Sequence, residues 1–234
     1  VAVINAGGFA VLGEALHSPD HIAADIKWIR DRIGGKPFGI DLVLPASVPE
    51  ERTVEQLIAE IPQTHRDFEQ KIKRKYNVPD PKQAPDLHIW GGLDQKRALA
   101  QVEVVFDERV PVFASGLGSP AFLLKRAHQL GMQVWGLVGK PKQAKKQIAA
   151  GTDVIIAQGF DAAGHTGNIG TFSIVPQIAD AARAAGVPVL AAGGVTTGRH
   201  LAAALVLGAS GVWTGSLWLA SRESDVNLPM KEKL

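Results

Sequence analysis

The chain has 234 residues, of which 46% are hydrophobic and 21% charged, and these proportions exclude a disordered or collagen-like chain. Its 25 basic and 23 acidic residues leave a formal net charge of +2, too small for the basic surface of a nucleic-acid-binding protein. No cysteine is present, which excludes disulfides, iron–sulfur clusters, thiolate zinc sites and cysteine nucleophiles. We therefore expect a cytoplasmic protein that acts on a small molecule, with no nucleic-acid or membrane partner. The composition leaves an oligomer open.

Short β-rich runs alternate along the chain with alanine-rich and charged stretches of helical period. From Val110 onward the runs recur about every 20 to 34 residues, the length of a strand plus a crossover helix. They are apolar on both faces, as buried parallel strands are. This repetition predicts a βα barrel or a doubly wound sheet. The runs are 38–45, 110–115, 133–138, 153–159, 187–194 and 211–216.

Residues 46–108 interrupt the alternation. Charged helical stretches at 52–61 and 65–76 are followed there by a proline-rich segment at 78–86. We interpret 46–108 as a helical insertion that packs over one end of the sheet as a lid or side lobe. The barrel itself is then expected to comprise residues 1–45 and 109–234.

The stretch QGFDAAGHTG, residues 158–167, follows the apolar run DVIIA and carries a lone histidine, His165. In a βα barrel the residues just beyond the carboxyl end of each strand line the catalytic mouth. One interpretation is a histidine that only satisfies a loop carbonyl. The small neighbours, Ala162, Ala163 and Gly164, favour instead a loop on which a flat ligand lies with one imidazole aimed at it.

Two further strand ends finish in glycine, in AAGGV (191–195) and TGS (214–216). Such loops aim backbone N–H groups outward, which suits a phosphate at the mouth of a barrel. The alternative is that Gly193 and Gly194 only turn a tight corner. NAGGF (5–9) is a third and weaker glycine turn.

His17 and His21 have the i, i+4 spacing of a possible metal site. Ser18 and Pro19 between them are typical of a helix start, and the sequence offers no obvious further ligand beside them. We therefore expect no metal ligands in this chain.

Together the glycine and histidine motifs resemble those of the nitronate monooxygenase family, formerly called 2-nitropropane dioxygenases. QGFDAAGHTG, LAAGGV, LGASGVWTGSLWL, INAGGFAVLG and FGIDLVLP occur in the order of that family and at barrel spacing. The resemblance implies a TIM-type (β/α)8 barrel that binds FMN. It implies His165 as the catalytic residue and a phosphate held by the backbone of Gly193, Gly194, Gly215 and Ser216. The flavin ring is then expected near Ala6, Gly7, Asp41, Gln158 and Gly164.

The activity that the resemblance implies is oxidation of alkyl nitronates by dioxygen to a carbonyl compound and nitrite. His165 would act as a base toward a neutral nitroalkane, or as an imidazolium partner of an anionic nitronate. Two alternatives stay open, because a fold does not determine a function. One is an FMN- and NADH-dependent enoyl-acyl-carrier-protein reductase, and the other is a flavin-free phosphate-binding barrel with a regulatory role.

Three departures from the family pattern leave the substrate open. Asp41 stands where the family commonly has asparagine, and an ionised aspartate accepts hydrogen bonds but cannot donate them. Leu137 stands where some members have lysine, and Asp161 to His165 replace the common EAGGH.

The resemblance also places VAVI, residues 1–4, at the end of the first helix, although β-branching alone would favour a strand there. The first strand of the barrel would then precede Val1, and seven of eight strands would remain. We therefore expect the chain to be a portion of a longer polypeptide.

Overall fold

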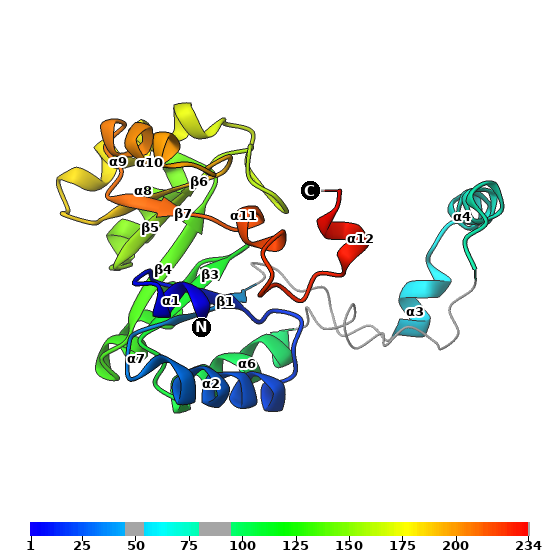
Figure 1. Ribbon diagram of the computed structural model, residues 1–234, viewed down its shortest axis with the longest axis horizontal. Coiled ribbons are helices and arrows are strands. Elements are labelled where there is room, and N and C mark those ends of the chain that lie inside the picture. The colour runs from blue at the N-terminus through cyan, green and yellow to red at the C-terminus, as the bar shows by residue number, and fades with distance from the viewer. Residues whose placement is uncertain (45–53, 80–94, 234) are drawn as a thin grey trace.

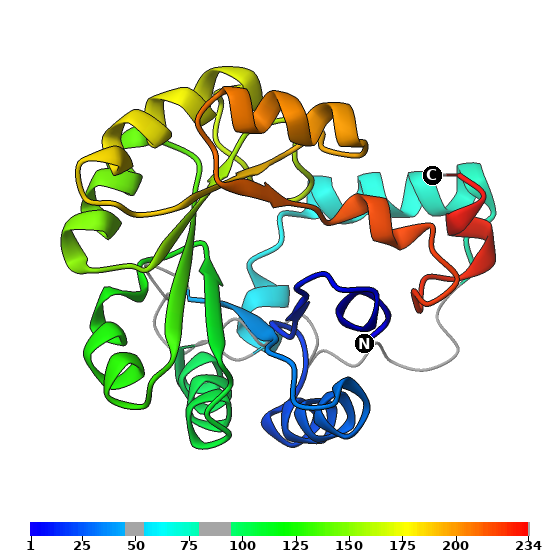
Figure 2. The ribbon, with the colours of Figure 1, turned by 60° about the vertical axis from the view of Figure 1, so that its left-hand side comes forward.

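Seven parallel strands form one sheet in this computed structural model, which describes residues 1–44, 54–79 and 95–233. Each strand pairs with the next one along the chain, so that β1 and β7 are the two edges of the sheet. The sheet curls with helices on its outer side, as in a TIM-type barrel that lacks one strand (Figures 1 and 2). The strands are β1 (Val11–Gly13), β2 (Gly39–Val43), β3 (Val112–Gly116), β4 (Gln133–Val138), β5 (Val154–Gln158), β6 (Val189–Ala192) and β7 (Gly211–Trp213).

Helices separate the strands along the chain. None of the described helices is both long enough and apolar enough to cross a lipid bilayer. They are α1 (Ala2–Asn5), α2 (Pro19–Ile33), α3 (Val54–Ala59), α4 (Gln63–Tyr76), α6 (Gln95–Asp107), the 3₁₀ turn η1 (Pro120–Phe122), α7 (Leu124–Gln129), α8 (Pro141–Ala150), α9 (Thr171–Arg183), α10 (Gly198–Val206), α11 (Ser216–Leu219) and α12 (Leu228–Lys231).

The barrel prediction is confirmed, and each of the six predicted runs contains a strand. The seventh strand, β1, comes from the GGFAVLG segment, and VAVI lies at α1 rather than in a strand. Ser18 and Pro19 begin α2 as expected: the backbone N–H of His21 donates to Ser18 Oγ (3.3 Å), and Pro19 occupies the first turn.

The hydrophobic core lies between the sheet and the outer helices, in two clusters. One joins α2, α6 and α7 to β2, β3 and the start of β4, and the other joins α8, α9 and α10 to β4, β5 and β6. Strand alternation explains which side chains take part. On β2, Ile40 and Leu42 are fully buried against the helices, whereas Asp41 points to the interior of the curled sheet. The two faces of each strand therefore have different roles, one in stability and one in lining the lumen.

The carboxyl part of the predicted insertion, 46–108, contains helix α6. Helix α6 packs on α2 and β2, and its Val102, Val105 and Phe106 are fully buried in the core. It therefore belongs to the ring of helices around the barrel. Helices α3 and α4 lie to the side of the barrel in Figure 1, and α4 has no buried residue. A lid formed by α3 and α4 stays a prediction, and most of the proline-rich segment 78–86 lies outside the described residues.

Replacing Phe106 with alanine tests the placement of α6. Phe106 is fully buried and meets the ring of Phe113 edge-on, with 5.8 Å between ring centroids. We expect the variant to lose about 3–5 kcal/mol of unfolding free energy, measured by urea denaturation. Phe68→Ala on α4 is the matched control, because Phe68 is 62% exposed, and it should change stability by about 0.5 kcal/mol or less. Equal losses in the two variants would contradict the assignment of α6 to the barrel core.

Candidate functional site

The carboxyl ends of β5, β6 and β7 bring the predicted glycine and histidine loops to one edge of the sheet. Gln158 is the last residue of β5 and is in register with Ala192, the last residue of β6. Gly193 and Gly194 follow directly, and the Gly215 loop follows β7, which pairs with β6. Three neighbouring strands therefore present these loops side by side, as expected for the mouth of a barrel.

The loop between β5 and α9 is fixed at its base and exposed at its tip. The Phe160 N–H donates to Ile169 O (2.9 Å), which closes the loop. The backbone N–H of Thr171 donates to Asp161 Oδ2 (2.7 Å), and hydrogen bonding to Thr171 lowers the pKa of Asp161. Asp161 thereby caps the start of α9.

His165 lies in the outer part of this loop, with an exposed side chain. Within the described ranges, no hydrogen bond joins its ring to another residue. The interpretation of His165 as a histidine that satisfies a loop carbonyl therefore has no support in the described structure. Gly164 before it has φ of 80°, a conformation that favours glycine, and it turns the chain immediately ahead of the imidazole.

Gly193 is required for close packing of the two loops. Its φ is 111°, and a Cβ atom there would lie 2.5 Å from Thr171 Oγ1 and 3.0 Å from the Ala162 backbone nitrogen. Gly194 next to it has φ of 67°. The tight-corner interpretation therefore accounts for this pair, whether or not a phosphate also binds to its amides.

Gly215 differs from that pair because nothing in the protein requires a glycine there. Its φ is −121°, and apart from its chain neighbours no atom of the described residues lies within 4 Å of the position a Cβ would take. The turn around it is held by Trp218, whose Nε1–H donates to Thr214 O (3.1 Å) and Thr214 Oγ1 (2.9 Å). Gly215 and Ser216 thus border open space at the carboxyl edge of β7.

Asp41 supplies an unsatisfied carboxyl group inside the curled sheet. It lies in register with Gly13 of β1 and Ala114 of β3, both of which leave room for its side chain. Asp41 Oδ1 is buried and has no hydrogen-bond partner among the described residues. Burial raises the pKa of Asp41 to about 6. The group can therefore accept a hydrogen bond when ionised, or donate one when protonated, as the family's asparagine amide would.

Ala6 and Gly7 differ from the other predicted residues in where they lie along the chain. They follow α1 and precede β1, and the chain enters a strand at its amino end. The expected place of these two residues near the flavin ring stays a prediction.

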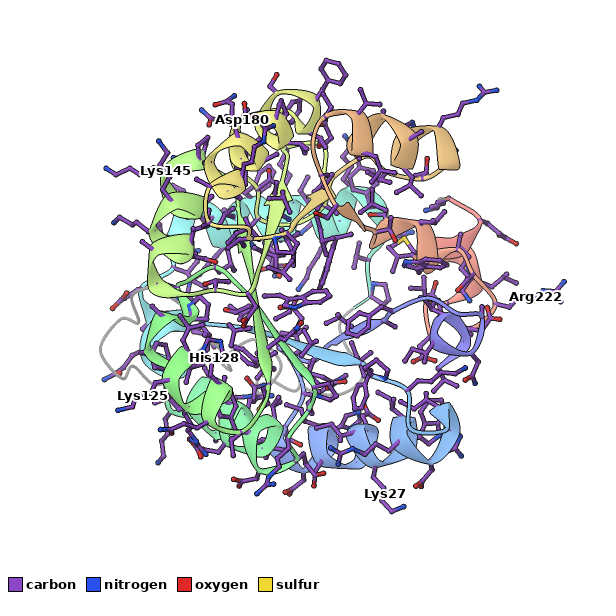
Figure 3. The ribbon with its side chains drawn as sticks, turned by 90° about the vertical axis from the view of Figure 1, so that its left-hand side faces the viewer. Lys27, Lys125, His128, Lys145, Asp180 and Arg222 are labelled. Atoms are coloured by element: carbon purple, nitrogen blue, oxygen red, sulfur yellow. The ribbon has the colours of Figure 1, made fainter. Side chains whose placement is uncertain are left out.

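Three aromatic rings inside the curled sheet were not predicted. Trp135 of β4 lies 5.1 Å from Phe9, just before β1, and 6.3 Å from Trp213, at the end of β7 (centroid distances). A strand in the middle of the sheet thus reaches the residues at both sheet edges. Figure 3 shows side chains filling this interior, while the labelled charged residues lie on the outside. The inward alternation of Trp135 and Trp213 was the signal that could have identified them.

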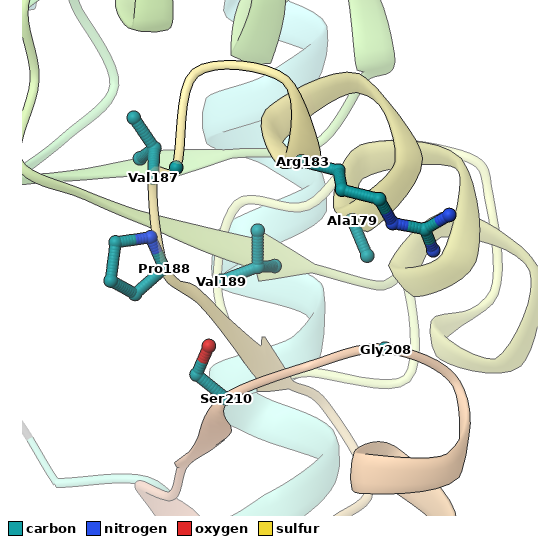
Figure 4. A pocket seen from close by; sticks show the side chains of 8 residues that line it. Ala179, Arg183, Val187, Pro188, Val189, Gly208 and Ser210 are labelled. Carbon is teal, nitrogen blue, oxygen red and sulfur yellow. The ribbon is translucent and has the colours of Figure 1, made fainter.

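The pocket in Figure 4, of about 240 Å³, is separate from the candidate site. It is lined by Pro188 and Val189 at the amino end of β6, Ser210 before β7, and Arg183 of α9. These residues lie at the amino ends of the strands, away from His165 and the glycine loops.

Asp41→Asn tests the buried carboxyl. The pKa of Asp41 is about 6 in the folded protein, above its ordinary 3.8, so the unfolded chain ionises first as pH rises. Stability of the unmodified protein should therefore fall between about pH 4 and pH 6 and stay lower above that range. The asparagine variant should lack this loss and be more stable at pH 7 by about 3 kcal/mol. Urea unfolding at a series of pH values measures both proteins.

Asp180→Asn is the control for that series, because Asp180 lies on α9 with an exposed side chain (68%). Its stability should follow the pH dependence of the unmodified protein. A pH profile of Asp41→Asn that matches these two would show that the Asp41 carboxyl is solvated.

Comparisons with known proteins agree with this geometry. A "Putative monooxygenase" of Mycobacterium tuberculosis is 39% identical over 239 residues, which cover 99% of this chain and 63% of that protein. A "Probable nitronate monooxygenase" of Staphylococcus saprophyticus is 28% identical over 96% of this chain and 62% of its own length. The chain thus spans about three fifths of these relatives.

Solved structures show the same fold. Nitroalkane oxidase from Streptomyces ansochromogenes superposes with a TM-score of 0.77 and 29% identity, over 99% of this chain and 64% of that one. FabK from Thermotoga maritima superposes with a TM-score of 0.73 and 29% identity, over 99% and 58% of the two chains. The family model of nitronate monooxygenases matches residues 1–234. The chain therefore belongs to the nitronate monooxygenase family, which is flavin-dependent.

Proposed function

We propose that this protein binds FMN and oxidises alkyl nitronates with dioxygen, yielding a carbonyl compound and nitrite. The observation that carries the proposal is that the His165 loop and the glycine loops after β6 and β7 lie at the same edge of the sheet, at the mouth of the barrel. The lumen of that barrel holds Asp41, whose Oδ1 has no hydrogen-bond partner among the described residues. Membership of a flavin-dependent family supports it.

The residues at the mouth fit an FMN group. Open space beside Gly215 can admit a phosphate to the backbone, and the amides of Gly193, Gly194 and Ser216 are near along the same edge. Asp41 Oδ1 has no hydrogen-bond partner among the described residues and can accept a hydrogen bond from a ring N–H. Gln158 at the end of β5 and Gly164 in the loop after it are proposed to lie near the same ring. When bound, FMN would supply the electron acceptor and the reactivity toward dioxygen.

In this proposal the role of His165 depends on whether the substrate still carries the proton that must be removed. Its exposed imidazole is not occupied by a hydrogen bond to any described residue, so it is available to a substrate. Toward a neutral nitroalkane it would remove the proton from the carbon next to the nitro group. Toward a nitronate, which has already lost that proton, the imidazolium would balance the negative charge. Asp161, engaged at the start of α9, holds the base of the loop and takes no part in the proton transfer.

The absorbance spectrum of the purified protein, followed by anaerobic addition of a nitronate, distinguishes the candidate functions. Bleaching of bound flavin, followed by nitrite release on admission of air, supports the proposal, and mass spectrometry of the released flavin identifies FMN. Steady NADH consumption with an enoyl thioester and no nitrite release would favour the reductase alternative. A colourless protein that binds inorganic phosphate would favour the flavin-free alternative.

His165→Asn should retain the flavin while activity on neutral nitroalkanes falls by about 10²- to 10⁴-fold, the usual range for a lost general base. Activity on preformed nitronates should fall less, because no proton needs to be removed from them. His128→Asn is the matched control, since His128 pairs with Asp153 (3.0 Å) away from the carboxyl edge, and it should leave kcat/KM unchanged. Unchanged turnover of His165→Asn on both substrates would rule out a role for this histidine.

Gly215→Val should weaken FMN binding, because the branched side chain would fill the space beside the backbone where the phosphate is proposed to lie. Because φ is −121° and the described part of the chain leaves the Cβ position open, the flavin-free variant should unfold at an unchanged temperature. Gly194→Val is a less specific test, because φ of 67° strains any valine there and should lower the unfolding temperature as well. Full flavin content in Gly215→Val would place the phosphate elsewhere.

A further inference from the structure

Two histidines and an aspartate meet outside the flavin site, at the start of α2. Side-chain ligand atoms of His17, His21 and Asp25 all lie within 4.8 Å of one another. His21 Nε2 is 3.2 Å from Asp25 Oδ2, and the rings of His17 and His21 lie 4.2 Å apart at 33° to each other. The three residues follow one another at intervals of four along one side of the helix start, and Asp25 is the further ligand that the sequence-based expectation missed.

A fourth residue, Glu14, orients the first histidine. Its side chain is fully buried, and its Oε2 contacts His17 Nδ1 at 2.6 Å. A carboxylate that accepts the Nδ1–H bond fixes the tautomer whose lone pair is on Nε2, the arrangement commonly found behind metal-bound histidines. Glu14 Oε1 is buried and has no hydrogen-bond partner among the described residues, so the side chain still has an acceptor atom unused next to the cluster.

The backbone around these residues is held by the barrel. The Glu14 N–H donates to Asp41 O (3.0 Å), which ties the exit of β1 to β2. From α6, Gln101 Nε2–H donates to His17 O (2.7 Å) and Ala15 O (3.1 Å). Gln101 is itself 2% exposed, so the loop that carries His17 is anchored by a buried amide. The backbone that carries the proposed ligands is thus held in place, while the rings of His17 and His21 stay accessible.

We propose that His17, His21 and Asp25 form a binding site for a divalent transition-metal cation of the Zn²⁺ type, with Glu14 positioning His17. Two imidazoles and one carboxylate, with water at the open position, are a donor set that Zn²⁺ accepts. Zn–N and Zn–O bonds of about 2.0–2.2 Å require the ligand atoms to close to about 3–3.5 Å of one another. The side chains of His17 and His21 are 47% and 54% exposed, so small side-chain rotations can bring them that close.

The site lies beside the exit of β1, on the outer side of the sheet with α2 and α6, and uses none of the residues assigned to FMN or catalysis. The proposal therefore does not depend on the proposed oxidation of nitronates. A second explanation of the cluster is a hydrogen-bonded clamp that only fixes the start of α2. The two explanations differ in whether metal binds with defined stoichiometry.

Equilibrium dialysis of the tag-free, flavin-loaded protein against Zn²⁺, followed by metal analysis, tests the site. We expect one tightly held Zn²⁺ per chain, at least 10-fold weaker binding in His21→Ala and Asp25→Asn, and about 10- to 100-fold weaker binding in Glu14→Gln, in line with losses seen when a supporting carboxylate is removed. His128→Ala is the matched control, because it breaks the histidine–aspartate pair with Asp153 on another part of the surface, and it should leave Zn²⁺ binding unchanged.

A site-resolved measurement on the unmodified protein tests the site even if the variants fold poorly. In the unmodified protein, Zn²⁺ should slow the carbethoxylation of His17 and His21 by diethyl pyrocarbonate at least about 10-fold, and should not slow that of His128, as followed by peptide mass mapping. Equal Zn²⁺ affinity in the unmodified protein and His21→Ala, or no selective protection of His17 and His21, would overturn the proposal and leave the hydrogen-bonded clamp as the explanation.

Discussion

The parallel pairing of all seven strands determines where chemistry can occur in this chain. Because each strand runs in the same direction, all carboxyl ends reach one edge, and every returning helix must cross on the outer side. The Gly159 N–H donates to Ala192 O (2.9 Å), which joins the β5 and β6 exits directly. Gln158 and Ala192, which are 34 positions apart in the sequence, become neighbours through this register and not through any local structure. The same pairing separates the apolar core, outside the sheet, from the lumen, inside it.

Much of this fold could be predicted from the sequence, since buried parallel strands such as 153–159 are apolar on both faces and separated by one helix length. Helix α6 was assigned to the insertion because its burial depends on tertiary contacts. Its sequence begins with the polar residues Gln95, Lys96 and Arg97, whereas Val102 and Phe106 show their role only when α2 and β2 pack on them. The local pattern did hold a usable signal, because residues 98–106 of α6 are apolar except for Gln101 and Glu103, whereas the exposed helix α4 is mostly polar and charged.

The candidate site likewise has a part that the sequence could predict and a part that it could not. His165 and Gly193 were identifiable because they follow a strand directly, and their position relative to that strand fixes the edge on which they lie. Ala6 and Gly7 also form a recognisable glycine turn, but they precede a strand, and their place near the flavin ring stays a prediction. The Phe9, Trp135 and Trp213 cluster joins residues before β1, within β4 and at the end of β7, and Glu14 joins β1 to α2. Strand alternation could indicate that Trp135 and Trp213 face inward, but the partners in both contacts are set by the tertiary fold.

Two buried carboxyl groups, Asp41 on β2 and Glu14 directly after β1, lie on opposite faces of the sheet. The Glu14 N–H donates to Asp41 O, and alternation along the strands directs the Asp41 side chain to the lumen and the Glu14 side chain to the outer helices. Each side chain has one oxygen without a partner among the described residues. A buried polar atom left in that state costs about 1–3 kcal/mol, a large share of the net stability of a domain. In both cases burial raises the pKa, so each site favours either a proton or a positively charged or hydrogen-bonding ligand. Each side of the sheet therefore has a buried carboxyl group that favours such a ligand. Asp41 faces the lumen, where the flavin is proposed to bind. Glu14 faces the outer side, where it contacts His17 of the proposed metal site.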